Sequence, residues 1–207
     1  MKIARDGWPV IAFTAFMLFG SLFFSPAAGF ILAPVLGLVI WFFRDPERIP
    51  LGDGFLSPAD GKIVEIEEAE HPFTGRAVKI GIFMNPLDVH VNRLPCSGRI
   101  EYLEYVPGKK WMAFAPKASE VNERMYVGLG TDFGPVLLVQ IAGFLARRIV
   151  CRLKKGDELD RGERFGMIKL GSKVDVYLPA GVQLAVTEGE KVYAGRTVLG
   201  GMPGDEA

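Results

Sequence analysis

Hydrophobic and polar positions follow two different patterns along the chain, and the change comes after Phe43. From Trp8 to Phe43 the sequence contains no charged residue, and apolar side chains dominate it. This stretch is longer than the roughly 20 residues that one crossing of a bilayer core requires. Pro26 interrupts it near the middle, where a turn costs least. The pattern therefore predicts two short apolar helices, at about 8–24 and 27–43, that form a hairpin.

Basic residues flank both ends of the apolar block, with Lys2 and Arg5 before it and Arg44 and Arg48 after it. A hairpin returns both ends to one face of a membrane, which the positive-inside rule makes the cytoplasmic face. We expect residues 1–43 to anchor the chain in the cell membrane, with the rest facing the cytoplasm. Two alternatives stay open, namely a cleaved signal peptide and a hairpin buried in a protein core, because spans this short only just cross a bilayer.

Beyond the apolar block, short runs rich in β-branched residues alternate with Gly, Pro and Asp. This alternation is typical of β-strands joined by tight turns, and we find no long amphipathic helix in this part. Residues 44–207 are therefore predicted to form one β-rich domain. The expected strands are 62–66, 77–84, 99–106, 136–142, 149–153, 173–178 and 183–186.

An internal repeat refines this prediction. Residues 153–162 and 186–195 share the pattern apolar-x-x-Gly-acidic-x-apolar-x-x-Gly. Such a unit suits tight turns in which glycine adopts positive φ. Two copies related by a pseudo-twofold axis resemble the barrel-sandwich hybrid fold of biotinyl and lipoyl carrier domains, and Leu56–Val64 resembles the first strand and turn of that fold. The predicted fold class is thus a mostly β, barrel-sandwich-hybrid-like domain with an N-terminal helical hairpin.

Composition and charge exclude several functions. Lys+Arg and Asp+Glu both total 24, so the basic excess that nucleic-acid binding normally requires is missing. The two cysteines, Cys96 and Cys151, are too few and too far apart for a disulfide framework or a zinc site. With only His71 and His90 in the chain, a His-rich metal centre is not expected either. We expect neither a nucleic-acid partner nor a metal.

The pair Gly171-Ser172 is the first candidate for chemistry. Strand-like runs at 165–170 and 173–178 flank it, so we expect a hairpin whose tight turn holds the bond between the two residues. A Gly-Ser pair by itself is more often a plain turn. A serine after a glycine can, however, attack the unhindered glycine carbonyl if a base accepts the proton and donors stabilise the oxyanion. No Gly-x-Ser-x-Gly motif supports an α/β-type serine hydrolase.

Two other segments could supply the base and the donors. Asp60 precedes a glycine in a predicted turn, where its alternative role is only to form that turn. Asp88, His90 and Asn92 alternate with apolar residues, so an extended strand would place all three on one face. A lone histidine is usually structural, but a face shared with an aspartate and an asparagine is unusual in a β core and favours a function.

Several segments, in this order along the chain, resemble the short bacterial and archaeal form of the phosphatidylserine decarboxylase family. They are Phe42–Pro46, Ser57–Gly61, Asp88–Arg93, Tyr105–Gly108, Asn122–Arg124, Asp132–Pro135 and Arg164–Ser172. The resemblance implies a self-processing lyase that converts phosphatidylserine to phosphatidylethanolamine and CO2 on a phospholipid membrane. It also implies that neither pyridoxal phosphate nor a metal takes part.

The same resemblance assigns the cleavage site and the cofactor. Gly171-Ser172 matches the self-cleavage pair of the family, which implies that Ser172 becomes a covalent pyruvoyl group (pyruvate) at the start of an α chain, 172–207. Residues 1–171 would form the β chain, and the two chains would stay together as a heterodimer. The pyruvoyl carbonyl would form a Schiff base with the amine of the lipid and act as the electron sink.

Further roles are implied around this centre. Asp60 matches the residue that helps to activate the serine, and His90 matches a histidine linked to decarboxylation. Arg93 stands where longer members of the family carry a second histidine tied to self-cleavage. The general base therefore stays open between Asp60, His90 and a water. Asp88, Asn92 and Arg93 are expected to contact the substrate.

Lipid recognition is the least constrained part. Arg124 is expected to bind the phosphate as a bidentate donor, with a structural ion pair as the alternative. The basic and aromatic segment 109–114 is expected to contact lipid, with a solvated turn as the alternative. An archaeal ether-linked phosphoserine lipid would fit the same site. A non-catalytic lipoyl-like module also stays open, although Leu170–Lys173 lacks the Met-Lys-Met of carriers. A homo-oligomer is neither predicted nor excluded.

Overall fold

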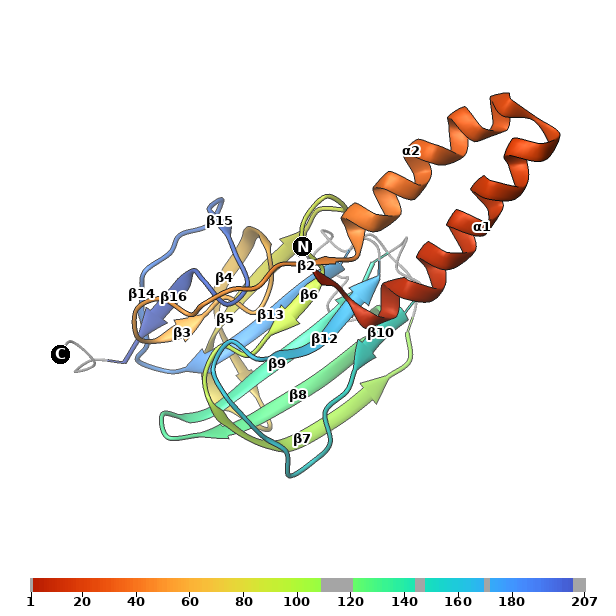
Figure 1. The fold of residues 1–207 in the computed structure, drawn as a ribbon. Helices are drawn as coiled ribbons and strands as arrows, with labels where there is room; N and C mark the ends of the chain where they lie inside the picture. The colour runs from red at the N-terminus through yellow and green to blue at the C-terminus, as the bar shows by residue number, and fades with distance from the viewer. Residues whose placement is uncertain (1, 109–120, 144–147, 170–171, 203–207) are drawn as a thin grey trace. The chain divides into compact units, whose positions relative to one another are not determined.

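The computed structural model describes residues 2–108, 121–143, 148–169 and 172–202. The chain divides into two compact units, and the boundary between them along the sequence lies between Glu47 and Arg48. Figure 1 labels most of the helices and strands of both.

The first unit is a helical hairpin. A short 3-10 helix (Arg5–Gly7) leads into α1 (Trp8–Phe24), and α2 (Pro26–Phe42) follows directly. Ser25 is extended between them, and Pro26 occupies the first turn of α2, where its missing N–H costs nothing. The predicted pair of helices is therefore confirmed to within a residue.

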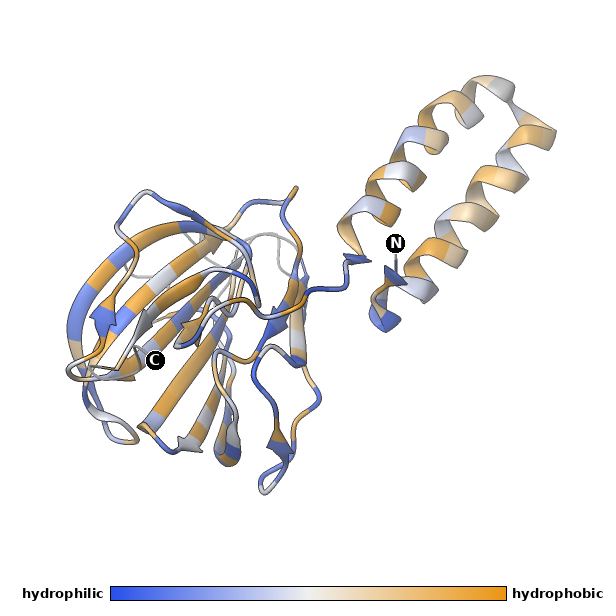
Figure 2. Cartoon of the chain, turned by 60° about the vertical axis from the view of Figure 1, so that its left-hand side comes forward, coloured by the Kyte–Doolittle hydropathy of each residue, from blue (hydrophilic) through white to orange (hydrophobic). Residues whose placement is uncertain are grey.

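The two ends of the hairpin lie side by side, because β1 (Lys2–Ile3) pairs antiparallel with β2 (Arg44–Asp45). Apolar residues cover both helices along their length (Figure 2). Many of these side chains are exposed, and Phe24, for example, is 92% exposed. The stretch Arg5–Phe24 is long and apolar enough to cross a membrane by length and composition, and the second apolar helix is shorter.

The second unit contains three antiparallel sheets among its described residues. The large sheet has the strand order β11 (Glu158–Leu159), β7 (Gly98–Val106), β8 (Arg124–Thr131), β9 (Gly134–Ala142), β13 (Ser172–Pro179), β5 (Gly75–Met84), β4 (Gly61–His71) and β15 (Lys191–Val192). One small sheet has the order β10 (Arg148–Cys151), β12 (Arg164–Lys169) and β6 (Val91–Arg93). The other has the order β14 (Gln183–Leu184), β16 (Val198–Gly201) and β3 (Phe55–Leu56). The large sheet has two ends, so it does not close into a barrel, and the mostly β fold class is confirmed.

One core joins the three sheets. It combines Val174 of the large sheet with Phe165 of β12 and with Phe55 and Leu199 of the β14–β16–β3 sheet. Along β13 the side chains alternate, so that Val174, Val176 and Leu178 enter this core while the residues between them face the opposite side of the large sheet. We call these two sides the inner and the outer face.

Each of the seven predicted strand runs contains a strand, but several strands were not predicted, and β8 is the longest of them. Its interior holds two glycines, which normally weaken a strand. In the folded domain other side chains fill their place. The Phe73 ring lies over Gly128, 2.6 Å from where a Cβ would be, and the Glu101 side chain covers Gly130.

The prediction of a hairpin around Gly171-Ser172 is wrong. The run before this pair is β12, which pairs with β6 and β10, whereas the run after it is β13, which pairs with β5 and β9. The two strands belong to different sheets, because each finds its partners elsewhere in the chain. Leu170 and Gly171 lie outside the described residues.

The sequence repeat is a structural repeat. Its glycines Gly156, Gly162, Gly189 and Gly195 all have positive φ, between 67° and 96°, as predicted. Equivalent backbone hydrogen bonds hold both copies: Gly156 N–H donates to Ile100 O at 2.8 Å, and Gly189 N–H donates to Ile63 O at 2.9 Å.

The repeat extends to the segments that these turns contact. Gly162 N–H donates to Leu94 O, and Gly195 N–H donates to Ser57 O. The partner segments 57–63 and 94–100 share the pattern x-Pro-x-x-Gly-basic-Ile. Asp60 and Ser97 therefore occupy equivalent positions, and each accepts a backbone hydrogen bond from the equivalent turn.

Candidate active site

Ser172 begins the central strand β13, opposite Met84 of β5 on one side and Ala142 of β9 on the other. Its side chain is fully buried on the inner face, and its Oγ has no hydrogen-bond partner among the described residues. A buried hydroxyl without a partner costs about 1–3 kcal/mol. Such a group is uncommon unless chemistry requires it.

His90 is also fully buried. Its Nδ1 lies 2.9 Å from the carbonyl oxygen of Asp88. A carbonyl oxygen only accepts hydrogen bonds, so Nδ1 carries a proton in this contact. The contact fixes the orientation of the ring and directs Nε2 away from the Asp88 carbonyl.

The expectation that Asp88, His90 and Asn92 share one strand face is not met, because the strand comprises only Val91–Arg93. Asp88 precedes it in a turn. Its carboxylate accepts the N–H of Asn85 at 2.9 Å and forms an ion pair with Lys191. The local turn and this ion pair together draw Asp88 away from the line of the strand.

Asn92 contacts a residue that the sequence analysis did not single out. Gln140 of β9 donates from Nε2 to Asn92 Oδ1 at 2.8 Å, and both side chains are fully buried. Asn92 Nδ2 lies 3.4 Å from Pro58 O and 3.6 Å from Met84 Sδ. Met84 is directly opposite Ser172, and Gln140 is two residues from Ala142, which is opposite Ser172 on the other side, so this amide pair lies near the serine. An isolated glutamine within the apolar run of β9 was the available sequence signal.

Asp60 is held in a buried ion pair with Arg48. The two terminal guanidinium nitrogens of Arg48, Nη1 and Nη2, donate to the two carboxylate oxygens, and Ala194 N–H donates to Oδ1 at 2.8 Å. Arg48 also donates to Ala194 O at 2.7 Å. Sequence analysis had counted Arg48 only among the basic residues beside the anchor. Here it fixes the turn that carries Asp60.

Arg93 is engaged between the two repeat turns. Its Nη1 donates to Gly162 O at 3.0 Å, and its stem lies against Gly195, where an added Cβ would be 2.8 Å from Cδ. A guanidinium remains protonated in proteins. Arg93 therefore cannot replace the second histidine of the longer family members as a base.

Arg124 lies on the outer face. It is opposite Ile141, which in turn is opposite Lys173, whereas the serine hydroxyl is on the inner face. Its guanidinium is 5.8 Å from the centre of the Tyr126 ring, a cation–π distance. The segment 109–114, expected to contact lipid, lies outside the described residues.

A network of buried charges occupies the outer face directly behind Ser172. Lys173 forms ion pairs with Glu65 and Asp175, and Lys79 lies 3.0 Å from Glu65. Burial raises the pKa of Asp175. Burial would also raise the pKa of Glu65, but Lys173 and Lys79 outweigh that effect and lower it. Gly81 makes room for this network, because a Cβ there would lie 2.5 Å from Lys173 Cε.

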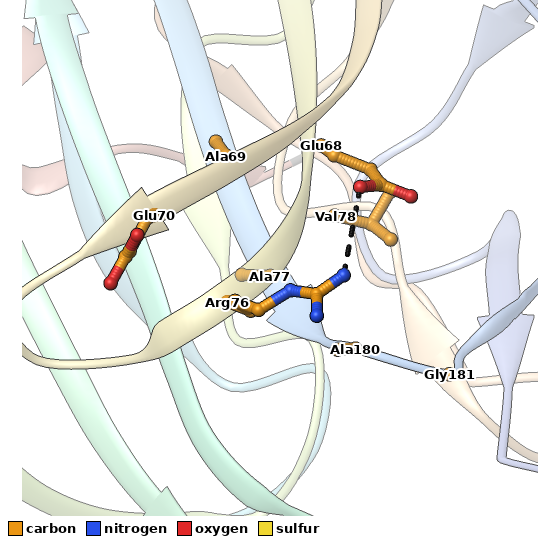
Figure 3. Close-up of a pocket in the computed structure, with 8 residues that line it drawn as sticks. All are labelled: Glu68, Ala69, Glu70, Arg76, Ala77, Val78, Ala180 and Gly181. Carbon is orange, nitrogen blue, oxygen red and sulfur yellow. Dashed lines mark ion pairs between the residues drawn. The ribbon is translucent and has the colours of Figure 1, made fainter.

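The cavity drawn in Figure 3 is not part of this centre. It has a volume of about 400 Å³ and is lined by β4, β5 and the turn at Gly181. Two of its charged residues, Glu68 and Arg76, form a loose ion pair of 3.9 Å between exposed side chains. None of the candidate residues lines it.

Comparison with known proteins identifies the family. The family model described as phosphatidylserine decarboxylase matches residues 35–200, a range that includes Asp60, His90 and Ser172. The chain belongs to the phosphatidylserine decarboxylase family. It is 51% identical to the phosphatidylserine decarboxylase proenzyme of Chlorobium luteolum over 86% of this chain and 87% of the relative. It is 48% identical to that of Symbiobacterium thermophilum over 97% and 96%. Since the second of these matches covers nearly the whole chain, we conclude that this member of the phosphatidylserine decarboxylase family is an enzyme.

Proposed function

We propose that the chain is a proenzyme that cuts itself between Gly171 and Ser172 and then decarboxylates phosphatidylserine to phosphatidylethanolamine. The observation that carries the proposal is the Ser172 hydroxyl, which lies at the start of a central strand. This hydroxyl is buried and has no hydrogen-bond partner among the described residues. The names of the relatives, decarboxylase proenzymes, support both halves of it.

Self-cleavage begins when Ser172 Oγ attacks the carbonyl carbon of Gly171, and the amide becomes an ester as the nitrogen takes up a proton. Loss of the Ser172 α-proton then breaks the ester Cβ–O bond. This leaves the Gly171 carboxylate and a dehydroalanine at position 172. Addition of water and release of ammonia convert the dehydroalanine to the pyruvoyl group. No oxidant or reductant is needed.

The sheet keeps the two products together. β13 pairs with β5 from Ser172 to Pro179 and with β9 from Ser172 to Tyr177. The α chain 172–207 would therefore stay bound to the β chain by these two ladders, as a heterodimer. Ser172 fits the pyruvoyl group, since its side chain already projects into the buried centre.

When formed, a pyruvoyl carbonyl supplies the electron sink that lets CO2 leave an amino-acid headgroup. His90 would donate a proton from Nε2 to the substrate carbon that has lost CO2, because its ring is held by Asp88 O and directs Nε2 away from that contact. Asn92 would donate to the substrate beside Ser172. Asp88 and Arg93 would support substrate binding through the turns that they hold.

In the same proposal, Asp60 is the carboxylate that assists activation of Ser172, and Arg48 keeps it in position. Arg124 would bind the lipid phosphate at the end of the sheet, where β8, β9 and β13 all have a terminus close to Ser172. No observation favours an ether lipid or a non-catalytic carrier over phosphatidylserine.

The apolar hairpin would anchor the enzyme in the cell membrane, so that its substrate need not leave the bilayer. Lys2, Arg5 and Arg44 flank the helices and support a cytoplasmic location for both ends. Extraction from membranes by detergent but not by alkaline carbonate would agree with this anchor, and release by carbonate would contradict it.

The test of the proposed function is the mass of the purified protein, wild type beside Ser172→Ala. The α chain has 36 of 207 residues, so the 22.7 kDa precursor should give chains of about 19 and 4 kDa. The smaller chain should have a blocked, pyruvoyl N-terminus, and only wild type should convert phosphatidylserine. A wild-type chain that stays whole would refute the self-processing mechanism.

A further inference from the structure

Gln140 lies on the same face of the large sheet as Ser172. It is opposite Val174, and Ala142, two residues further along β9, is opposite Ser172. Directly paired residues share a face, so Gln140 and Ser172 are diagonal neighbours, with Cα atoms about 7–8 Å apart. Gln140 is fully buried. A buried amide in an apolar strand is costly unless it is hydrogen-bonded.

The contacts of Asn92 determine which way both amides point. One side of the Asn92 amide faces two acceptors, Pro58 O at 3.4 Å and Met84 Sδ at 3.6 Å. That side must be the NH2 group, because the reverse orientation would set an oxygen against both acceptors. Asn92 Oδ1 then faces Gln140, whose Nε2 donates to it at 2.8 Å.

Gly166 makes this bond possible. It is opposite Asn92 in the neighbouring pair of strands, and a Cβ at Gly166 would lie 3.0 Å from Gln140 Nε2. The small sheet therefore approaches the large one closely at this point, and the two amides link the sheets beside Ser172.

We propose that Gln140 is a positioning residue for self-cleavage. By donating to Asn92 Oδ1, it holds the Asn92 N–H toward Met84 and hence toward the position of Ser172. Both present contacts of the Asn92 amide are weak, because the contact with Pro58 O is long at 3.4 Å and the Met84 thioether is a weak acceptor, so the N–H can turn to a better acceptor. The acceptor is an oxygen that becomes negative beside Ser172 during cleavage. This inference rests on the proposed function.

The test is the rate at which newly translated precursor separates into two chains in a cell-free reaction with membranes. Gln140→Leu removes the donor and keeps the site apolar, and it should slow cleavage at least tenfold. Val136→Ala is the matched control, since Val136 is a fully buried residue of the same strand and face. It should cleave at nearly the wild-type rate. Thermal unfolding of each variant combined with Ser172→Ala reports folding separately from cleavage.

Gln140→Glu supplies a readout that a purely structural role would not change. Its protonated carboxyl can donate to Asn92 Oδ1, but its carboxylate only accepts and would draw the Asn92 N–H away from Ser172. Cleavage of this variant should therefore slow as pH rises, relative to wild type at each pH. This readout is the shape of a pH profile and does not use the Gln140→Leu variant, so it decides the question even where Gln140→Leu does not fold.

The inference is overturned if folded Gln140→Leu cleaves at the wild-type rate, or if Gln140→Glu follows the wild-type pH profile. Failure of the wild type to cleave is a different result, because it removes the proposed function and not only the role of Gln140.

Discussion

Replacing Arg48 with methionine should destabilise the catalytic unit far more than removing an exposed arginine. The side chains of Arg48 and Asp60 are only 8% and 5% exposed, and the guanidinium holds both carboxylate oxygens. Removing one partner of a buried ion pair leaves an uncompensated charge and costs about 3–5 kcal/mol. For a domain of this size, each kcal/mol lowers Tm by about 2–4 °C. The expected fall is therefore roughly 6–20 °C.

The assay is thermal or urea unfolding of the full chain in detergent, with every variant combined with Ser172→Ala so that the chain stays whole. Arg76→Met is the control, because Arg76 and Glu68 are exposed and 3.9 Å apart. Such a pair contributes at most about 1 kcal/mol. Arg48→Lys should fall between the two, since lysine keeps the charge but not the bidentate geometry.

A double-mutant cycle with Asp60→Leu tests the physical cause. If the cost comes from the stranded carboxylate, Arg48→Met combined with Asp60→Leu should be more stable than the sum of the single changes predicts. A loss below about 1 kcal/mol for Arg48→Met, or strict additivity in the cycle, would refute the reasoning.

Four further outcomes are expected. Gly81→Ala should destabilise the domain by about 1–3 kcal/mol, because its Cβ would meet Lys173, and urea unfolding measures this. Glu65→Gln should cost more at pH 7 than at pH 3. The pKa of Glu65 is lowered on folding, so its contribution is present above the unfolded pKa and is lost as pH falls through the folded pKa; a pH-independent difference would contradict this. Burial raises the pKa of Cys96 to about 12, so iodoacetamide at pH 8 should label it only after unfolding, as mass spectrometry of native and urea-treated protein would show. His90→Ala should lower decarboxylation by about 10²–10⁴-fold in a lipid assay normalised to cleaved enzyme, and unchanged turnover would exclude His90 as the proton donor.

Much of the architecture could be predicted from local patterns. An uncharged run with one proline near its middle predicts two apolar helices whatever their surroundings, because apolar helices satisfy their own backbone. Alternation of apolar and polar residues predicts strands, since successive side chains point to opposite faces. The positive φ of Gly156 and Gly189 could be predicted as well, because tight turns depend on the conformation of single residues.

The pairing of those strands with one another could not be predicted from local patterns. The runs on either side of Gly171-Ser172 look like the arms of a hairpin, yet β12 and β13 belong to different sheets. Pairing depends on which distant strands share a core, and neither run carries that information by itself. β8 was missed for a related reason, because Phe73 fills the space above Gly128 only after the chain has folded.

The candidate site shows the same division. The sequence by itself predicted Asp60, His90 and Ser172 as the residues that carry the chemistry, because they lie in recognisable motifs. The tertiary structure decided what holds them, namely Arg48 on Asp60 and the buried link from Gln140 to Asn92 beside Ser172. These partners are 12 and 48 residues apart in the chain. A buried polar group needs a partner in space, and only packing of the sheets determines which residue provides it.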